Sequence, residues 1–191
     1  MTQTLFLDPR TTALVLIDLQ QGIVSRPLAP HSGPQVVANG ARVADAMRAK
    51  GAPVIYVRVP LNDLLHLPAD APSRAPDAPP APDEASELVP EAGVQAGDLI
   101  VAKRQWGAFY GTDLEQQLRR RGIQTIVICG IATNFGVEST ARQAFDQGYQ
   151  LVFVEDATTS MSDDWHRFAV ENVFRRMGRV RSTQQVIDAL A

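Results

Sequence analysis

The amino-acid sequence predicts an α/β fold of three layers, α-β-α, in which a central parallel sheet lies between helices. Short apolar runs rich in β-branched residues recur along the chain and are continuous rather than alternating, which indicates strands buried on both faces. They cover residues 13–17, 54–59, 99–102, 125–129 and 151–154, with a weaker run at 179–181. Segments with helical apolar spacing separate these runs, and strands that alternate with helices form parallel sheets with right-handed crossovers.

The expected helices carry residues that favour helix ends. They cover 35–50, 112–121, 135–147 and 165–177, with a short last helix from Ser182. Thr112 with Glu115, and Ser182 with Gln185, have the spacing of a capping box, in which two side chains satisfy the free amides at a helix start. A glycine follows each of the first three helices, as is common at helix C-termini.

The totals favour a single domain, residues 1–191, in the cytoplasm. The chain of 191 residues is 45% hydrophobic and 20% charged, which supplies enough apolar material for a core. Its formal net charge of −3 offers no basic field for nucleic acid. We expect no signal peptide and no membrane helix, because no apolar run is long enough. A small-molecule substrate is therefore the expected partner, and one cysteine, Cys129, cannot form an intramolecular disulfide.

Residues 67–90 differ from the rest of the chain, because they hold seven of its thirteen prolines. Such a segment cannot form a central strand or a regular helix. It is either a surface excursion or a loop that covers the active site or a subunit interface.

Unusual residues follow three of the expected strands. Asp18 comes directly after 13–17, Lys103 follows 99–102, and the glycine-containing loop 130–136 joins a strand to a helix. In open parallel sheets, ligands bind outside the carboxyl ends of the strands, so these groups converge on one edge. Asp18 alone is equally a turn or helix-capping residue, and a lysine at a strand end, such as Lys103, is usually a solvated surface residue.

Backbone and aromatic groups extend this candidate site. The start of the helix after loop 130–136 exposes free amides that suit an oxyanion or carboxylate, and Gly136 leaves room for a ligand to approach them. Trp106, Phe109 and Tyr110 lie in the short loop after Lys103. They form either the apolar walls of a pocket or a plug at the sheet edge.

Three segments, ALVLIDLQ (13–20), 103–123 and 127–157, resemble in order and spacing the isochorismatase-like hydrolase family, also called cysteine hydrolases. The resemblance implies a Rossmann-like sheet of strand order 3-2-1-4-5 and a homodimer or homotetramer. It implies catalytic roles for Asp18 and Lys103, and binding of an oxyanion by the backbone of Ala132 and Gly136. It also implies a substrate pocket, which we expect to contain Gln20, Trp106, Phe109, Asn134 and Phe135.

The chain departs from the family at its nucleophile. Many members carry a cysteine in the motif G-x-x-T-x-x-C-V, which here reads GIATNFGV from Gly130, so that Gly136 occupies the nucleophile's position. The family often has a cis peptide just before the threonine, which maps to Ile131 and Ala132. Cys129 is no substitute, because it is expected inside a strand as a small buried hydrophobe.

Nicotinamidase-type relatives also bind a metal through aspartate and histidine. Here the histidines, His31, His66 and His166, are far apart in sequence and fit no metal-binding motif. We therefore expect no metal and no cofactor.

Three functions remain open. The first is a non-covalent hydrolase of a small carboxylated or vinyl-ether metabolite with Asp18 as acid or base, as in the isochorismatases proper. The second is an amide hydrolase that activates water, and the third is a catalytically silent metabolite-binding protein. Arg26, Arg58 and Arg104 lie near strand ends and are candidate anchors for a carboxylate. Asp156, also after a strand, is expected to be structural.

Overall fold

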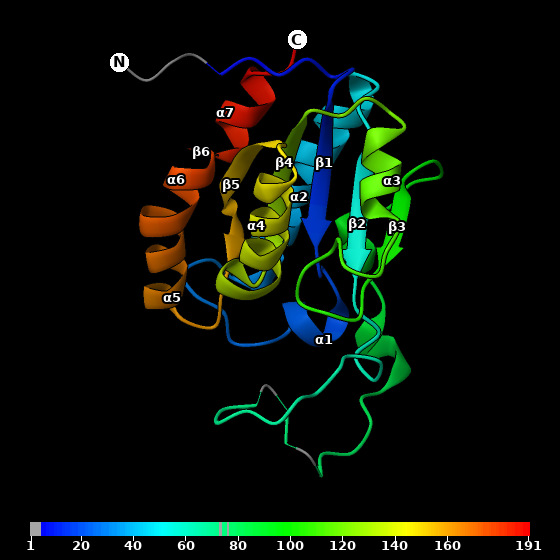
Figure 1. Cartoon of the computed structure of the whole chain (residues 1–191), viewed down its shortest axis with the longest axis vertical. Coiled ribbons are helices and arrows are strands. Elements are labelled where there is room, and N and C mark those ends of the chain that lie inside the picture. Colours follow the sequence, from blue (N-terminus) through cyan, green and yellow to red (C-terminus); the bar gives the residue numbers. More distant parts are fainter. Residues whose placement is uncertain (1–4, 73, 76) are drawn as a thin grey trace.

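The computed structural model describes residues 5–72, 74–75 and 77–191, and within them six parallel strands form one sheet in the order β3-β2-β1-β4-β5-β6 (Figure 1). The strands are β1 (Thr12–Ile17), β2 (Val54–Arg58), β3 (Leu99–Ala102), β4 (Thr125–Ile131), β5 (Gln150–Thr159) and β6 (Arg179–Arg181). This order contains the expected 3-2-1-4-5 arrangement, and β6 extends it at the β5 edge. The predicted α/β fold is confirmed.

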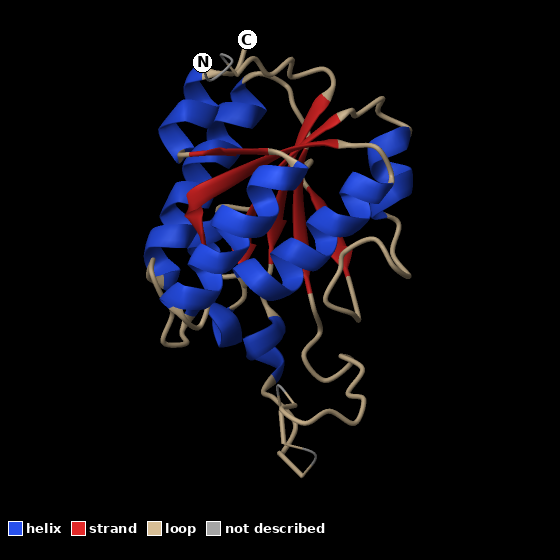
Figure 2. Cartoon of the chain, turned by 60° about the vertical axis from the view of Figure 1, so that its left-hand side comes forward, coloured by secondary structure: helices blue, strands red, loops and turns tan. Residues whose placement is uncertain are grey.

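Helices cover both faces of the sheet (Figure 2). The α-helices are α1 (Gln21–Val24), α2 (Gly33–Ala49), α3 (Leu114–Arg119), α4 (Glu138–Asp146), α5 (Asp163–Phe168), α6 (Arg175–Met177) and α7 (Thr183–Asp188). The 3-10 helices η1 (Asp83–Ser86) and η2 (Pro90–Ala92) precede β3, whereas η3 (Thr133–Val137) and η4 (Ala169–Phe174) are π-helical turns. The expected helices at 135–147 and 165–177 therefore each contain a wider π-helical turn.

The centre of the sheet is buried on both faces. In β1, Leu14 and Leu16 belong to the core under α2 and α7, whereas Val15 and Ile17 belong to the core under α3 and α4. This explains why the sequence of β1 is continuously apolar. For β3 the expectation of two buried faces is wrong, because β3 is an edge strand whose Ile100 is 54% exposed.

The two expected capping boxes differ in outcome. At α7, the Ser182 hydroxyl accepts from the Gln185 amide and the Gln185 side chain accepts from the Ser182 amide, which confirms the prediction. At α3 the prediction is wrong, because the Thr112 hydroxyl donates to the Ala108 carbonyl oxygen at 2.5 Å. The helix begins at Leu114 instead.

A long excursion, residues 59–98, leaves the carboxyl edge of the sheet after β2 and returns to form β3 (Figure 1). Its Pro-rich part extends away from the body of the molecule on the side where α1 lies. The Asn62 side chain links two parts of this excursion. Its nitrogen donates to the Ala81 carbonyl oxygen at 3.0 Å, and its oxygen accepts from the Ala81 amide at 2.8 Å. Within the described residues, no helix is long and apolar enough to cross a membrane.

Candidate active site

Asp18 stands at the carboxyl end of β1 in a strained backbone conformation. Its φ angle is 55°, in the left-handed region that residues with a Cβ rarely adopt. Its amide donates to the Val57 carbonyl oxygen at 2.9 Å, and the residue is only 6% exposed. Such strain persists only where the surrounding structure holds it, and it is concentrated at functional sites. The position is therefore unlike an ordinary solvated turn.

Lys103 reaches Asp18 from the end of β3. Its Nζ lies 2.7 Å from Asp18 Oδ2 and donates to the Trp106 carbonyl oxygen at 2.8 Å. The Lys103 side chain is 2% exposed, which excludes the alternative of a solvated surface lysine. Burial raises the pKa of Asp18 above its usual range, and the neighbouring ammonium opposes this shift without cancelling it.

The second oxygen of the carboxylate, Asp18 Oδ1, is buried and has no hydrogen-bond partner among the described residues. Asp18 is one of the residues that line a cavity of about 160 Å³, together with Lys103 and Gly136. A buried oxygen without a partner is costly unless a ligand or water completes it. Asp18 therefore has one oxygen paired with Lys103 and one buried oxygen whose hydrogen-bonding capacity is unused among the described residues.

Gly136 lies directly beside the ion pair. A Cβ at this position would be 3.1 Å from Lys103 Nζ and 3.2 Å from Asp18 Oδ2. A cysteine here would thus carry its thiol next to both groups, as the family motif implies. Among the described residues that line the cavity, none carries a thiol or a hydroxyl. These lining residues therefore offer no thiol or hydroxyl that could attack a substrate covalently.

The loop before Gly136 has the backbone geometry that the resemblance implied. The peptide bond between Ile131 and Ala132 is cis, and both residues line the cavity. Gly130 has a φ of 119°, and a Cβ there would overlap the Ile17 carbonyl oxygen. A glycine is therefore required where β4 passes β1.

Two of the five expected pocket residues line the cavity, and the other three do not. Trp106 and Phe135 line the cavity and pack edge-to-face with ring centroids 4.9 Å apart. Gln20 is wrong as a pocket residue, because its side chain is fully buried and bonded to the backbone of the excursion. Its amide nitrogen donates to the carbonyl oxygens of Val59 at 2.7 Å and Ser86 at 2.8 Å, and its oxygen accepts from the Val59 amide at 2.8 Å.

Phe109 and Asn134 also require correction. Phe109 packs into the core under α3 and α4, with its ring 6.1 Å from that of Tyr149, so it acts as a plug rather than a pocket wall. The Asn134 side-chain oxygen accepts from the Ser160 hydroxyl at 2.5 Å and so ties η3 to the end of β5. Neither residue belongs to the cavity lining.

Of the three candidate arginine anchors, Arg26 lines the cavity. Arg58 instead pairs with Glu87 at 2.8 Å, and Arg104 is 61% exposed with Asp63 at 3.6 Å. Sequence reasoning missed Arg74, which the Pro-rich segment brings to the cavity. The sequence pointed to Arg74 only through the second interpretation of the Pro-rich segment, in which that segment covers the active site.

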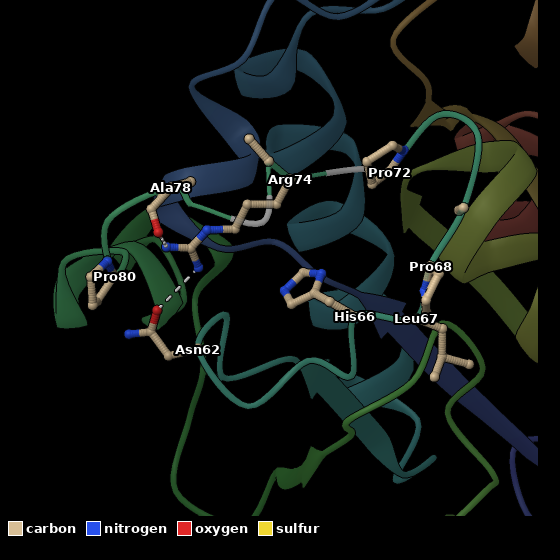
Figure 3. A pocket seen from close by; sticks show the side chains of 10 residues that line it. Asn62, His66, Leu67, Pro68, Pro72, Arg74, Ala78 and Pro80 are labelled. Atoms are coloured by element: carbon tan, nitrogen blue, oxygen red, sulfur yellow. Dashed lines mark hydrogen bonds between the residues drawn. The ribbon is translucent and has the colours of Figure 1, made fainter.

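The excursion encloses a second cavity, of about 650 Å³, beside the first (Figure 3). His66 and Arg74 line both cavities, and Arg74 donates to the Asn62 side-chain oxygen at 3.3 Å. The excursion therefore borders the candidate site and adds a cationic side chain to it.

Two residues outside the cavity behave as the sequence suggested. Cys129 is fully buried, and burial raises the pKa of its thiol to about 12, so it is not a nucleophile. Asp156 accepts hydrogen bonds from the Thr183 amide at 2.7 Å and the Thr183 hydroxyl at 2.8 Å. It fixes the start of α7 and is structural.

Two of the histidines that are far apart in sequence lie close together in the folded chain. His31 and His166 both lie against Glu155, with their Nε2 atoms 3.0 Å and 3.2 Å from its Oε1. Separation in sequence hid this cluster, since the loop before α2 and helix α5 meet at β5. The side chain of His166 also contacts the Thr133 hydroxyl at 2.8 Å, just behind the active-site loop.

Comparisons with known proteins agree with this geometry. Residues 12–185 match the family model described as the isochorismatase domain. The chain is 48% identical over 191 residues to YwoC of Bacillus subtilis, an uncharacterized isochorismatase family protein, with 98% of each chain covered. It is 30% identical over 214 residues to the ureidoacrylate amidohydrolase RutB of Methylobacterium radiotolerans, covering 96% of this chain and 81% of that protein.

A solved structure of an isochorismatase family protein from Burkholderia thailandensis superposes with a TM-score of 0.90. The two chains are 46% identical, and 98% of each is covered. Family model, sequence relatives and structure therefore agree over nearly the whole chain, and the protein belongs to the isochorismatase family of hydrolases.

Proposed function

We propose that the protein hydrolyses a small carboxylated metabolite without a covalent intermediate, and that Asp18 is its general acid and base. The chemistry is that of vinyl-ether hydrolysis, as in the isochorismatases. The observation that carries the proposal is the divided role of the Asp18 carboxylate. Lys103 holds Oδ2 at 2.7 Å, while Oδ1 is buried without a partner in the described chain, and Asp18 is one of the residues that line the cavity.

A general acid must hold a proton at the working pH and direct it at the substrate. Burial raises the pKa of Asp18, which favours the protonated form. Because the ammonium of Lys103 occupies Oδ2, we assign the proton to Oδ1, which has no partner among the described residues. The ion pair therefore selects the oxygen that delivers the proton.

The proposed reaction balances with water alone. Asp18 Oδ1 transfers its proton to the terminal carbon of the vinyl ether, and the ether oxygen stabilises the cation that forms at the neighbouring carbon. Water adds to that carbon and returns one proton to the Asp18 carboxylate. The hemiketal hydroxyl then gives up its proton to the ether oxygen as the bond between that oxygen and the carbon breaks, which yields an alcohol and a 2-keto acid such as pyruvate.

The rest of the cavity suits an anion with an apolar body. Arg26 and Arg74 are among its lining residues and supply positive charge, and a guanidinium can bind a carboxylate through two parallel hydrogen bonds. The walls are largely apolar and include Ile23, Leu61, Leu64, Phe135 and Met161. A site of this composition binds small organic acids and orients them through few polar contacts.

Amide hydrolysis is the second candidate, and the similarity to the amidohydrolase RutB favours it. In that reaction Asp18 would act as a base on water, since the cavity lining among the described residues offers no thiol or hydroxyl. The backbone of Ala132 and Gly136 would then lie beside the oxyanion. The raised pKa of Asp18 keeps its carboxyl protonated to higher pH than an ordinary aspartate, and this favours a general acid, which is why vinyl-ether chemistry is preferred.

A substrate panel separates the two candidates. Purified protein is incubated with vinyl-ether carboxylates and with small primary amides and ureido acids, and release of 2-keto acid and of ammonia is followed in parallel. The proposal expects 2-keto acid and no ammonia. In water enriched in oxygen-18, the alcohol product should contain none of the label, because water attacks the carbon on the keto-acid side. Ammonia release alone would establish the amidase alternative.

A further inference from the structure

A group of three side chains on the far side of η3 has metal-binding chemistry that the proposed reaction does not use. His31 lies in the loop before α2, Glu155 is in β5 and His166 is in α5. Their ligand atoms, the two Nε2 atoms and one carboxylate oxygen, all lie within 4.8 Å of one another. Three separate elements thus bring two imidazoles and a carboxylate to one point.

The distances agree with coordination of one ion. Zinc binds histidine nitrogen and carboxylate oxygen at about 2.0–2.2 Å, so ligand atoms around a tetrahedral ion are about 3.3 Å apart. The two Nε2 atoms are 3.0 Å and 3.2 Å from Glu155 Oε1. Two rings that share such an ion through Nε2 have centroids about 5 Å apart, and those of His31 and His166 are 5.7 Å apart. Only small side-chain movements separate this arrangement from a coordinated one.

The ring of His166 and the backbone of His31 are each held by a threonine hydroxyl, and a partner at the second ring nitrogen is typical of metal-binding histidines. His166 Nδ1 lies 2.8 Å from the Thr133 hydroxyl, so a proton on Nδ1 leaves Nε2 free to coordinate. The backbone of His31 is clamped to Thr159, whose hydroxyl donates to the His31 carbonyl oxygen at 2.7 Å and accepts from its amide at 3.2 Å. The site is therefore largely formed before an ion binds.

The cluster is also accessible and correctly charged. It borders a surface cavity of about 550 Å³ that Asp163 lines as well, which leaves room for water as a further ligand. Two neutral imidazoles and one carboxylate form a ligand set with a single negative charge, which suits a divalent cation.

We infer that His31, Glu155 and His166 bind a divalent transition-metal ion of the zinc type. Two histidines, one carboxylate and an open position for water form a ligand set that zinc accepts. The ion would join the loop before α2, β5 and α5. Through His166 it would also fix the side chain of Thr133, the first residue of the turn that carries Gly136.

Zinc titration of the tag-free, chelator-treated protein tests this inference. Isothermal titration calorimetry should show one zinc ion bound per chain, and the thermal midpoint should rise with zinc concentration, because the ion binds the folded chain. His31→Gln, Glu155→Gln and His166→Gln should each weaken binding more than about 100-fold, beyond the 10–100-fold loss typical of residues that only support a ligand. His66→Gln, a histidine outside the cluster, is the matched control and should bind as the unmodified protein does.

A second measurement does not depend on the variants folding. Cobalt added to the unmodified protein should give the intense visible bands of a four-coordinate ion, and zinc should remove them. Binding of less than about one tenth of an equivalent of zinc, the absence of those cobalt bands, or an equal loss of binding in His66→Gln would each overturn the inference. Because all readouts are binding readouts, they are independent of whether the proposed hydrolysis is correct.

Discussion

Lys103 Nζ lies 2.7 Å from Asp18 Oδ2 and 2.8 Å from the Trp106 carbonyl oxygen, and both charged side chains are almost fully buried. A buried ion pair is costly to form, and removal of one partner is costlier because it leaves a charge without compensation. The same two residues therefore control both the stability of this part of the fold and the chemistry of the cavity.

Replacement of Lys103 by methionine should lower the free energy of unfolding by about 3–5 kcal/mol at pH 7, because Asp18 is left buried and unpaired. The double variant with Asp18→Asn should recover a large part of this loss. Urea unfolding of the two single variants and the double variant measures the coupling directly. Arg142→Met is the control, since it breaks a pair with Glu138 at 2.9 Å whose arginine side chain is 58% exposed, and it should cost less than about 1 kcal/mol. An equal loss in both methionine variants would contradict the account.

The pH dependence follows from the raised pKa of Asp18. The folded state favours the protonated carboxyl, so the resulting stability is present below the ordinary carboxyl pKa and is lost as pH rises through the raised value. The rate should fall over the same range, because the general acid loses its proton. Profiles of kcat/KM and of unfolding free energy against pH check both. A rate that rises with pH through this range would assign Asp18 the role of a base.

Gly136→Cys should create a reactive thiol beside Asp18. The native protein should resist iodoacetamide, because Cys129 is buried and its pKa is raised to about 12. The variant should gain one adduct in mass spectrometry, since a Cβ at 136 lies 3.2 Å from Asp18 Oδ2 at the cavity.

The variant Gly136→Cys with Cys129→Ala is the control for this labelling and should react equally. Labelling that disappears when Cys129 is removed would show that the adduct forms elsewhere than at the cavity. The position assigned to the family's nucleophile would then be wrong.

Gln20→Met should weaken the attachment of the excursion to β1. It removes the three hydrogen bonds to Val59 and Ser86 and leaves the buried Val59 amide without its acceptor, at a cost of about 1–3 kcal/mol. Hydrogen exchange at residues 59–90 should accelerate. Gln124→Met, at an exposed position, should leave both stability and exchange unchanged. A Gln20→Met protein that behaves like this control would refute the structural role of Gln20.

The sequence predicted those features that depend on local pattern. Continuous burial of β1 followed from its apolar run, and the positions of Asp18 and Lys103 at strand ends followed from the rule that parallel strands share a carboxyl edge. Their contact was foreseeable because both strands end at that edge. The Ser182 and Gln185 capping box was equally local, since spacing alone defines it.

Features that depend on distant packing were not predictable in this way. Gln20 and Phe109 are residue types that are common in pockets. Only the fold shows that the Gln20 side chain bonds to backbone groups and that the Phe109 ring packs into the core. Arg74 reaches the cavity through a segment without regular pattern. His31 and His166 meet only because β5 lies between the elements that carry them.

The most direct test of the central claim is the turnover of Asp18→Asn on the substrate that the panel identifies. Asparagine keeps the size of the side chain but cannot donate the proton, so kcat should fall by about 10²–10⁴-fold while the circular dichroism spectrum stays the same. Asp146→Asn, at an exposed position at the end of α4, should retain full activity. Turnover by Asp18→Asn equal to that of Asp146→Asn would contradict the assignment of Asp18 as the general acid.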